Sequence, residues 1–178
     1  MSSFAYLYAL DRVSSVDPNW RANAVLVADA KYRVPVLWLA LLGDVDETFD
    51  DDEQVVFFAS RDEAVDRLAA RTARLAALFG MEITGYIECV IDEFEGAVSE
   101  LCVDATEVAF MSEPASFVAA VRGALRWLDD ESAQSGYQHL FEISSLEHDT
   151  RVRPADQEPT TAEERDQVLS LLGTLECG

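Results

Sequence analysis

Two long stretches of this chain contain no positively charged residue, although both are rich in acids. The first runs from Val34 to Ser60 and holds seven acids, Asp44, Asp46, Glu47, Asp50, Asp51, Asp52 and Glu53. The second runs from Leu75 to Val121 and holds nine, Glu82, Glu88, Asp92, Glu93, Glu95, Glu100, Asp104, Glu107 and Glu113. Neither stretch can neutralise its own charge. The fold must therefore bring distant arginines to these acids or present them as an acidic surface.

The charge of the whole chain excludes several classes of function. Its 178 residues include 34 Asp and Glu against 13 Lys and Arg, which gives a net charge of −21 at pH 7. Nucleic-acid binding needs cations that displace condensed counterions, and an anionic membrane surface repels acidic proteins. We therefore expect neither nucleic acid nor a membrane as a partner.

Composition predicts one folded domain in a reducing compartment. Hydrophobic residues make up 49% of the chain, and its length suits a single globular domain over residues 1–178. The start lacks the basic segment of a signal peptide, and the longest apolar run, Val34–Leu42, is far shorter than the roughly 20 residues that span a bilayer. The cysteines, Cys89, Cys102 and Cys177, fit neither a disulfide framework nor a zinc site, and we expect Cys89 and Cys102 to be buried and inert. These features favour a cytoplasmic protein.

The hydrophobic pattern predicts an α/β (α+β) fold, with a small mixed β-sheet packed with about five helices. Residues 11–33 are expected to be irregular, and Arg151–Pro159 to form a surface loop. Strands are expected at Phe4–Leu10, Gln54–Ala59, Leu101–Asp104, Val108–Met111 and Tyr137–Ile143.

Helices are predicted where apolar residues recur at helical spacing. Pro35 and Gly43 are typical of the two ends of a short buried helix. Capping-box sequences, Ser60 with Glu63 and Thr161 with Glu164, indicate the starts of two others. The predicted helices are Val34–Gly43, Ser60–Gly80, Ile83–Phe94, Ser112–Leu128 and Thr161–Leu175.

Three arginines, Arg67, Arg71 and Arg74, fall at i, i+4 and i+7 on the flank of the helix that starts at Ser60. Such a row could bind an anion or a phosphate. We favour the alternative, a surface row that pairs with neighbouring carboxylates, because exposed ion pairs are common in an acidic protein.

No motif for catalysis, metal or cofactor binding is present. The two histidines, His139 and His148, do not have the spacing of a metal site, and no nucleophile elbow or glycine-rich phosphate loop occurs. The segment from Asp44 imitates the start of a calcium loop, but Phe49 and Val55 stand where that loop needs glycine and glutamate. We predict no catalytic residues, no metal and no cofactor.

Two motifs near the start of the chain carry a family resemblance. Tyr6-Leu7-Tyr8 and, further on, Tyr32-Arg33-Val34-Pro35 leading to Gly43 are similar to the Tyr-Leu-Tyr start and Tyr-x-Ile-Pro segment of an uncharacterised bacterial family of small acidic proteins. The segment Val103–Val108 resembles its downstream strand. The family has no established activity to carry over to particular residues. Many proteins of this size and charge are immunity proteins encoded beside antibacterial toxins, and this analogy favours the same role here.

The leading hypothesis is an immunity protein that binds a cognate bacterial toxin and blocks its positively charged active cleft. An acidic inhibitor would be steered to such a cleft and held there by charged contacts. Trp127, off the buried face of its helix, is either an anchor for the partner or a packing residue. The expected partner-binding acids are Asp44, Asp46, Glu47, Asp50, Asp51, Asp52, Glu53, Glu88, Asp92 and Glu95.

Two alternatives remain open. One is a hydrolase that uses carboxylates to reverse a toxin's modification, which would need a concave site with convergent acids. The other is a nucleic-acid mimic, which would space its acids like phosphates along an elongated surface. The sequence leaves the oligomeric state and the identity of the toxin undetermined.

Overall fold

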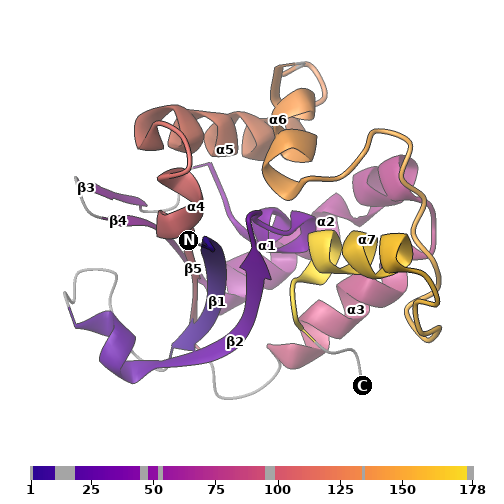
Figure 1. Ribbon diagram of the computed structural model, residues 1–178, viewed down its shortest axis with the longest axis horizontal. Helices are drawn as coiled ribbons and strands as arrows, with labels where there is room; N and C mark the ends of the chain where they lie inside the picture. Colours follow the sequence, from indigo (N-terminus) through magenta and orange to yellow (C-terminus); the bar gives the residue numbers. More distant parts are fainter. Residues whose placement is uncertain are drawn as a thin grey trace.

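A five-stranded antiparallel sheet forms the centre of the computed structural model (Figure 1). The strand order is β2-β1-β5-β4-β3, and every neighbouring pair is antiparallel. A mixed sheet was predicted, but the sheet is antiparallel throughout its described strands. The strands are β1 Phe4–Leu10, β2 Ala24–Lys31, β3 Thr48–Asp51, β4 Gln54–Ser60 and β5 Glu100–Asp104.

The structure describes residues 2–10, 19–44, 48–51, 54–94, 99–133 and 135–175, with the backbone alone for 48–51. Within these residues there are seven α-helices and one short 3-10 helix, η1. They are η1 Trp20–Asn23, α1 Val36–Leu41, α2 Arg61–Phe79, α3 Ile83–Glu93, α4 Thr106–Ala109, α5 Pro114–Asp129, α6 Ser135–Ser144 and α7 Ala162–Leu172.

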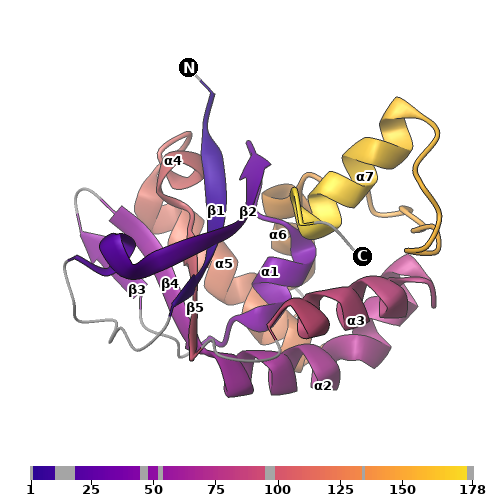
Figure 2. The same ribbon diagram turned by 90° about the horizontal axis from the view of Figure 1, so that it is seen from below.

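The helices α1, α2, α3, α5, α6 and α7 lie on one side of the sheet (Figure 2). The main core fills the space between them and the sheet, and every residue of α1 is buried in it. A smaller core on the opposite face of the sheet contains Trp20, which covers Val56, Phe58 and Cys102. The predicted α+β class and single domain are confirmed.

Helix α1 shows how local sequence and packing combine. Pro35 precedes its first residue and an extended Leu42 ends it, close to the predicted bounds. The indole nitrogen of Trp38 donates to the carbonyl oxygen of Leu172 at 2.9 Å, so the one polar atom of this buried side chain is satisfied.

Three predicted segments are wrong. Tyr137–Ile143, predicted as a strand, lies in α6, where Leu140, Phe141 and Ser144 are buried at helical spacing. Val108–Met111 begins in α4 rather than in a strand. Such short apolar runs suit either structure, and packing decides between them. Part of the segment predicted to be irregular forms β2, whose small Ala28 and Ala30 lie in the main core.

The two capping-box predictions have different outcomes. Thr161 accepts from the backbone N–H of Glu164, whose carboxylate accepts from the backbone N–H of Thr161 in return, as predicted. Helix α2 begins after Ser60 and ends at Gly80 (φ 97°) as predicted, but the Ser60 side chain makes no capping hydrogen bond. The helix therefore forms without that predicted cap.

The cysteines differ from the prediction at one position. Cys89 is disulfide-bonded, whereas it was expected to be a buried, inert thiol; its partner lies outside the described residues. Cys102 is free and buried, and burial raises the pKa of its thiol well above the usual value. A disulfide is typical of an oxidising compartment, so the cysteines no longer support a reducing one. Among the described residues, no helix combines the length and apolar character that a membrane crossing requires.

Helices α5 and α6 approach closely at two glycines. A Cβ atom on Gly136 would clash with the carbonyl of Gly123 and lie 2.7 Å from Cβ of Trp127. A Cβ atom on Gly123 would instead meet the imidazole edge of His139 at 3.3 Å. At position 136 a side chain would therefore collide with the backbone of α5, which cannot move aside, whereas at position 123 it would meet a side chain that can.

This difference yields a stability prediction. We expect Gly136→Ala to lower the free energy of unfolding by about 2 kcal/mol, because the added methyl forces the helices apart. Gly123→Ala should change it by less than about 1 kcal/mol, since the histidine can move and alanine favours the helix. Urea denaturation of both variants measures the two values. Equal losses would show that the close approach at Gly136 does not limit packing.

Candidate functional site

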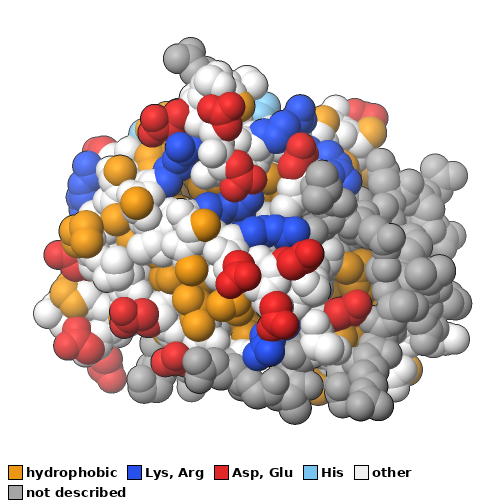
Figure 3. All heavy atoms as spheres, turned by 180° about the vertical axis from the view of Figure 1, so that it is seen from behind, with side chains coloured by type: hydrophobic (Ala, Val, Ile, Leu, Met, Phe, Trp, Pro, Cys, Tyr) orange, Lys and Arg blue, Asp and Glu red, His pale blue; other side chains and the backbone are white. Residues whose placement is uncertain are grey.

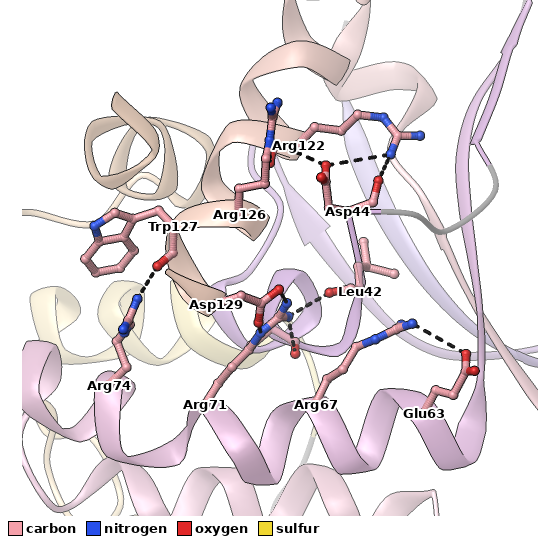
Figure 4. Close-up of polar contacts among 11 residues, drawn as sticks. Leu42, Asp44, Glu63, Arg67, Arg71, Arg74, Arg122, Arg126, Trp127 and Asp129 are labelled. Atoms are coloured by element: carbon pink, nitrogen blue, oxygen red, sulfur yellow. Dashed lines mark hydrogen bonds and ion pairs between the residues drawn. The ribbon is translucent and has the colours of Figure 1, made fainter. Parts of the chain in front are cut away.

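The three arginines of α2, Arg67, Arg71 and Arg74, contact groups within the protein (Figure 4). Arg71 is 3% exposed and makes two hydrogen bonds of 2.8 Å to the carboxylate of Asp129 on α5. It also donates to the carbonyl oxygens of Ala40 at 2.9 Å and Leu42 at 2.6 Å. These carbonyls end α1 and would otherwise be buried without a donor. One guanidinium therefore joins α1, α2 and α5.

The neighbours of Arg71 are also engaged. Arg67 pairs with Glu63 at 3.4 Å, one turn earlier on α2. Arg74 donates to the carbonyl oxygen of Trp127, and its guanidinium lies 5.4 Å from the centre of the indole ring. The predicted pairing with carboxylates holds for Arg67 and Arg71, but Arg71 is in the interior rather than on the surface. The contacts give no support to an anion site.

Trp127 occupies the second of its two predicted roles. Its side chain is buried, and its ring packs edge-on against Tyr137 of α6 at 5.2 Å. Together with the contact from Arg74, this packing holds α2, α5 and α6 together. The position favours a packing residue over a partner anchor.

The acidic segment from Asp44 to Glu53 is only partly described. Asp44 forms ion pairs with Arg122 at 4.0 Å and Arg126 at 3.6 Å, so α5 neutralises this acid (Figure 4). Asp50 and Asp51 lie in β3, for which the structure describes the backbone alone. Four other predicted contact residues of this segment lie outside the described residues: Asp46, Glu47, Asp52 and Glu53. Glu95, predicted on the acidic helix, also lies outside them.

An acidic groove of about 1180 Å³ lies between α3, α7 and the segment 154–159. Figures 1 and 2 place α7 and the segment before it beside α3. Tyr86, Val168 and Leu172 supply apolar lining. No Lys, Arg or His side chain is among the described residues that line the groove. Its acids are Glu82, Glu88, Asp92, Asp156 and Glu158.

The groove brings together two predicted contact residues, Glu88 and Asp92, with acids that sequence reasoning missed. Asp156 and Glu158 come from the loop predicted at Arg151–Pro159, more than 60 positions after Asp92. No spacing in the sequence connects the loop to α3. The only available signal was the presence of two acids in a loop without periodicity.

One carboxylate holds the loop wall of the acidic groove in place. Glu164 accepts from the backbone N–H of Thr160 at 2.7 Å and of Thr161 at 3.0 Å, and from Arg153 at 2.6 Å. These residues stand at the two ends of the segment 154–159. Hydrogen bonds from Thr160, followed by those from Thr161 and Arg153, lower the pKa of Glu164 to about 2. The loop is therefore closed at its base.

Figure 3 shows the molecule from behind. Lys, Arg, Asp and Glu side chains are intermixed over the middle and upper part of the described surface, whereas several Asp and Glu side chains gather at the lower left with no Lys or Arg beside them. The acids are therefore unevenly distributed over this face. Within the described part of the chain, no group of three or more His, Cys, Asp or Glu side chains could hold a metal ion.

The role of Arg71 can be tested by stability. Arg71→Met keeps much of the side-chain volume but leaves the carbonyls of Ala40 and Leu42 without their donor. We expect a loss of about 3 kcal/mol in the free energy of unfolding, measured with urea. The control is Arg126→Met, which breaks a pair at a 59% exposed side chain and should cost less than about 1 kcal/mol. Similar losses for both variants would contradict the interior role of Arg71.

The role of Glu164 predicts a pH dependence. Its folded pKa is about 2 against a usual value of 4.5. The carboxylate therefore stabilises the fold fully above about pH 4.5, and this contribution is lost as the pH falls toward 2. We expect wild type to exceed Glu164→Gln in stability at neutral pH, with the difference shrinking between these two values. Glu163→Gln, an exposed neighbour, is the control. A difference that stays constant down to pH 2 would contradict this account.

Comparisons with known proteins give no relative. No protein-family model matches the chain, no curated protein matches it, and no solved structure matches it. Its function must be inferred from its own residues.

Proposed function

We propose that the protein is an immunity protein that binds and neutralises a cognate antibacterial toxin, with the acidic groove as the surface that receives a basic part of the toxin. The observation that supports this proposal is a groove of about 1180 Å³ that has five carboxylates and no described cation in its lining. Unlike Asp44, these acids have no arginine beside them within the lining.

The size and chemistry of the acidic groove suit a polypeptide. Small-molecule sites usually occupy roughly 300–1,000 Å³ and are mostly apolar. This groove is larger, open, and lined by both carboxylates and apolar side chains. Lysine or arginine side chains of a partner could pair with Glu88, Asp92 and Glu158 while their aliphatic stems contact the half-buried Ala155 and Val168.

The net charge of −21 supports rapid association with a basic partner. A surplus of one sign steers an oppositely charged protein and raises its association rate, most strongly at low salt. Concentration of acids in one groove would orient the encounter. A nucleic-acid mimic would instead distribute its acids along an elongated surface.

The test uses the product of the gene adjacent to the one that encodes this protein. Co-expression should rescue a host from that product. The triple variant Glu88→Lys, Asp92→Lys and Glu158→Lys should abolish the rescue and weaken binding of the purified product at least about tenfold. The matched control carries the same charge change at exposed acids outside the acidic groove, Glu131→Lys, Glu147→Lys and Asp149→Lys. This control should still rescue.

Two outcomes would contradict the proposal. One is rescue by the groove variant equal to that of wild type. The other is neutralisation of the toxin at far less than one molecule of this protein per toxin, which would indicate the carboxylate hydrolase. Titration of the purified toxin's activity separates a stoichiometric inhibitor from an enzyme.

A further inference from the structure

Strand β2 is the outer strand at one end of the sheet, and half of its outer edge is open (Figure 1). Thr174, just after α7, covers the C-terminal half of this edge. Its N–H donates to the carbonyl oxygen of Asp29 at 2.8 Å, and its hydroxyl accepts from the N–H of Asp29 at 2.9 Å. No hydrogen bond in the described part of the chain joins another element to the outer edge of residues 25–27.

The open half is also apolar. Val25 is 66% exposed and Leu26 51% exposed, and the sequence Ala24-Val25-Leu26-Val27 contains no charge and no proline. Proteins usually protect an exposed edge strand with lysine, proline or a bulge, because its unpaired N–H and C=O groups can pair with another chain. The bulge in its pairing with β1 falls at Val27, because Leu7 pairs with Ala28 and Tyr8 with Leu26. Ala24, Val25 and Leu26 keep a regular register with β1 and are therefore the template for an added strand.

The sheet face beside this edge carries a row of aromatic rings on β1. Phe4, Tyr6 and Tyr8 are half-buried, and their ring centres are separated by 6.1 Å in each step. Trp20 packs edge-on against Tyr8 at 5.4 Å. Leu26 pairs with Tyr8 across β1 and β2, so the aromatic row adjoins the open edge.

Carboxylates surround the aromatic row. Asp29 and Asp104 are the register partners of Tyr6 on the two neighbouring strands. Partial burial, followed by the negative charges of Glu107, Asp29 and Asp104, raises the pKa of the Tyr6 hydroxyl. Rings flanked by carboxylates attract guanidinium and ammonium groups.

The protein already places one arginine in this way. Arg21 pairs with Asp104 at 2.5 Å, and its guanidinium lies 4.6 Å from the centre of the Trp20 ring. The same combination of a ring and a carboxylate is repeated nearer to the open edge by Tyr6 and Asp29.

We propose that the open edge of β2 and the adjoining aromatic row bind an extended, cationic segment of a partner protein. The segment would add a strand beside residues 24–26 and direct Arg or Lys side chains toward Tyr6 and Asp29. A second copy of this chain is disfavoured as the occupant because each copy has a net charge of −21. Binding at this edge does not require the acidic groove, so the two surfaces can be tested separately.

The probe is a short capped peptide of alternating Arg and Val that covers the open residues of β2 and leaves the hydrogen bonds between Thr174 and Asp29 in place. We expect it to bind at near-physiological salt, where distant charges are screened, and to shift the backbone amide resonances of β1 and β2. Leu26→Lys should weaken binding at least about tenfold, measured by calorimetry. The control Leu169→Lys adds the same charge at an exposed leucine on a different element, α7. It should leave binding unchanged.

Several results would overturn the proposal. They are amide shifts confined to the acidic groove, equal binding by Leu26→Lys, and equal binding of a peptide of alternating Glu and Val. A dimer of the free protein that dissociates in Leu26→Lys would show that a second copy occupies the edge. The triple variant at Glu88, Asp92 and Glu158 should bind the peptide like wild type. A loss there would assign the peptide to the groove instead.

Discussion

The buried guanidinium of Arg71 is the contact on which the arrangement of the helices depends. Helix α1 has no exposed residue, so its terminal carbonyl groups cannot reach water and need a donor from within the protein. Arg71 supplies that donor from α2 and anchors itself on Asp129 of α5. Because Asp129 is half exposed, the ion pair keeps one partner hydrated. A fully buried pair would carry a larger desolvation cost.

Ion pairs between distant parts of the chain also account for the positions of other arginines. Tertiary contacts draw arginines to particular acids, as in the pairs of Arg21 with Asp104 and of Arg153 with Glu164. A chain with 13 cations and 34 acids cannot supply every carboxylate in this way. The arginines in these pairs stabilise tertiary contacts. Five of the acids line the acidic groove, and others, such as Glu131, Glu147 and Asp149, are exposed elsewhere on the surface. The five carboxylates in one groove are the feature on which the proposed partner binding rests.

The sequence predicted the elements whose patterns are long. Helices α2, α3 and α5 repeat apolar residues over several turns, which only a helix can bury on one side. The run in α6 is too short for periodicity to decide, and the contact of Gly136 with Gly123 that favours its helix is a tertiary contact. Glu88 and Asp92 were predictable as an acidic helix face. Asp156 and Glu158 were not, because their proximity to that face depends on Glu164 and the packing of α7.

The end of α7 fixes the spacing of two surfaces. Gly173 has a positive φ of 66°, and a Cβ atom there would lie 2.6 Å from the Trp38 ring, so the chain must turn at this point. The next residue, Thr174, binds β2, and Leu175 after it lines the acidic groove. A single peptide bond thus separates the residue that closes half of the strand edge from one that shapes the groove. Thr174 and Leu175 therefore set how close the strand edge and the acidic groove lie to each other.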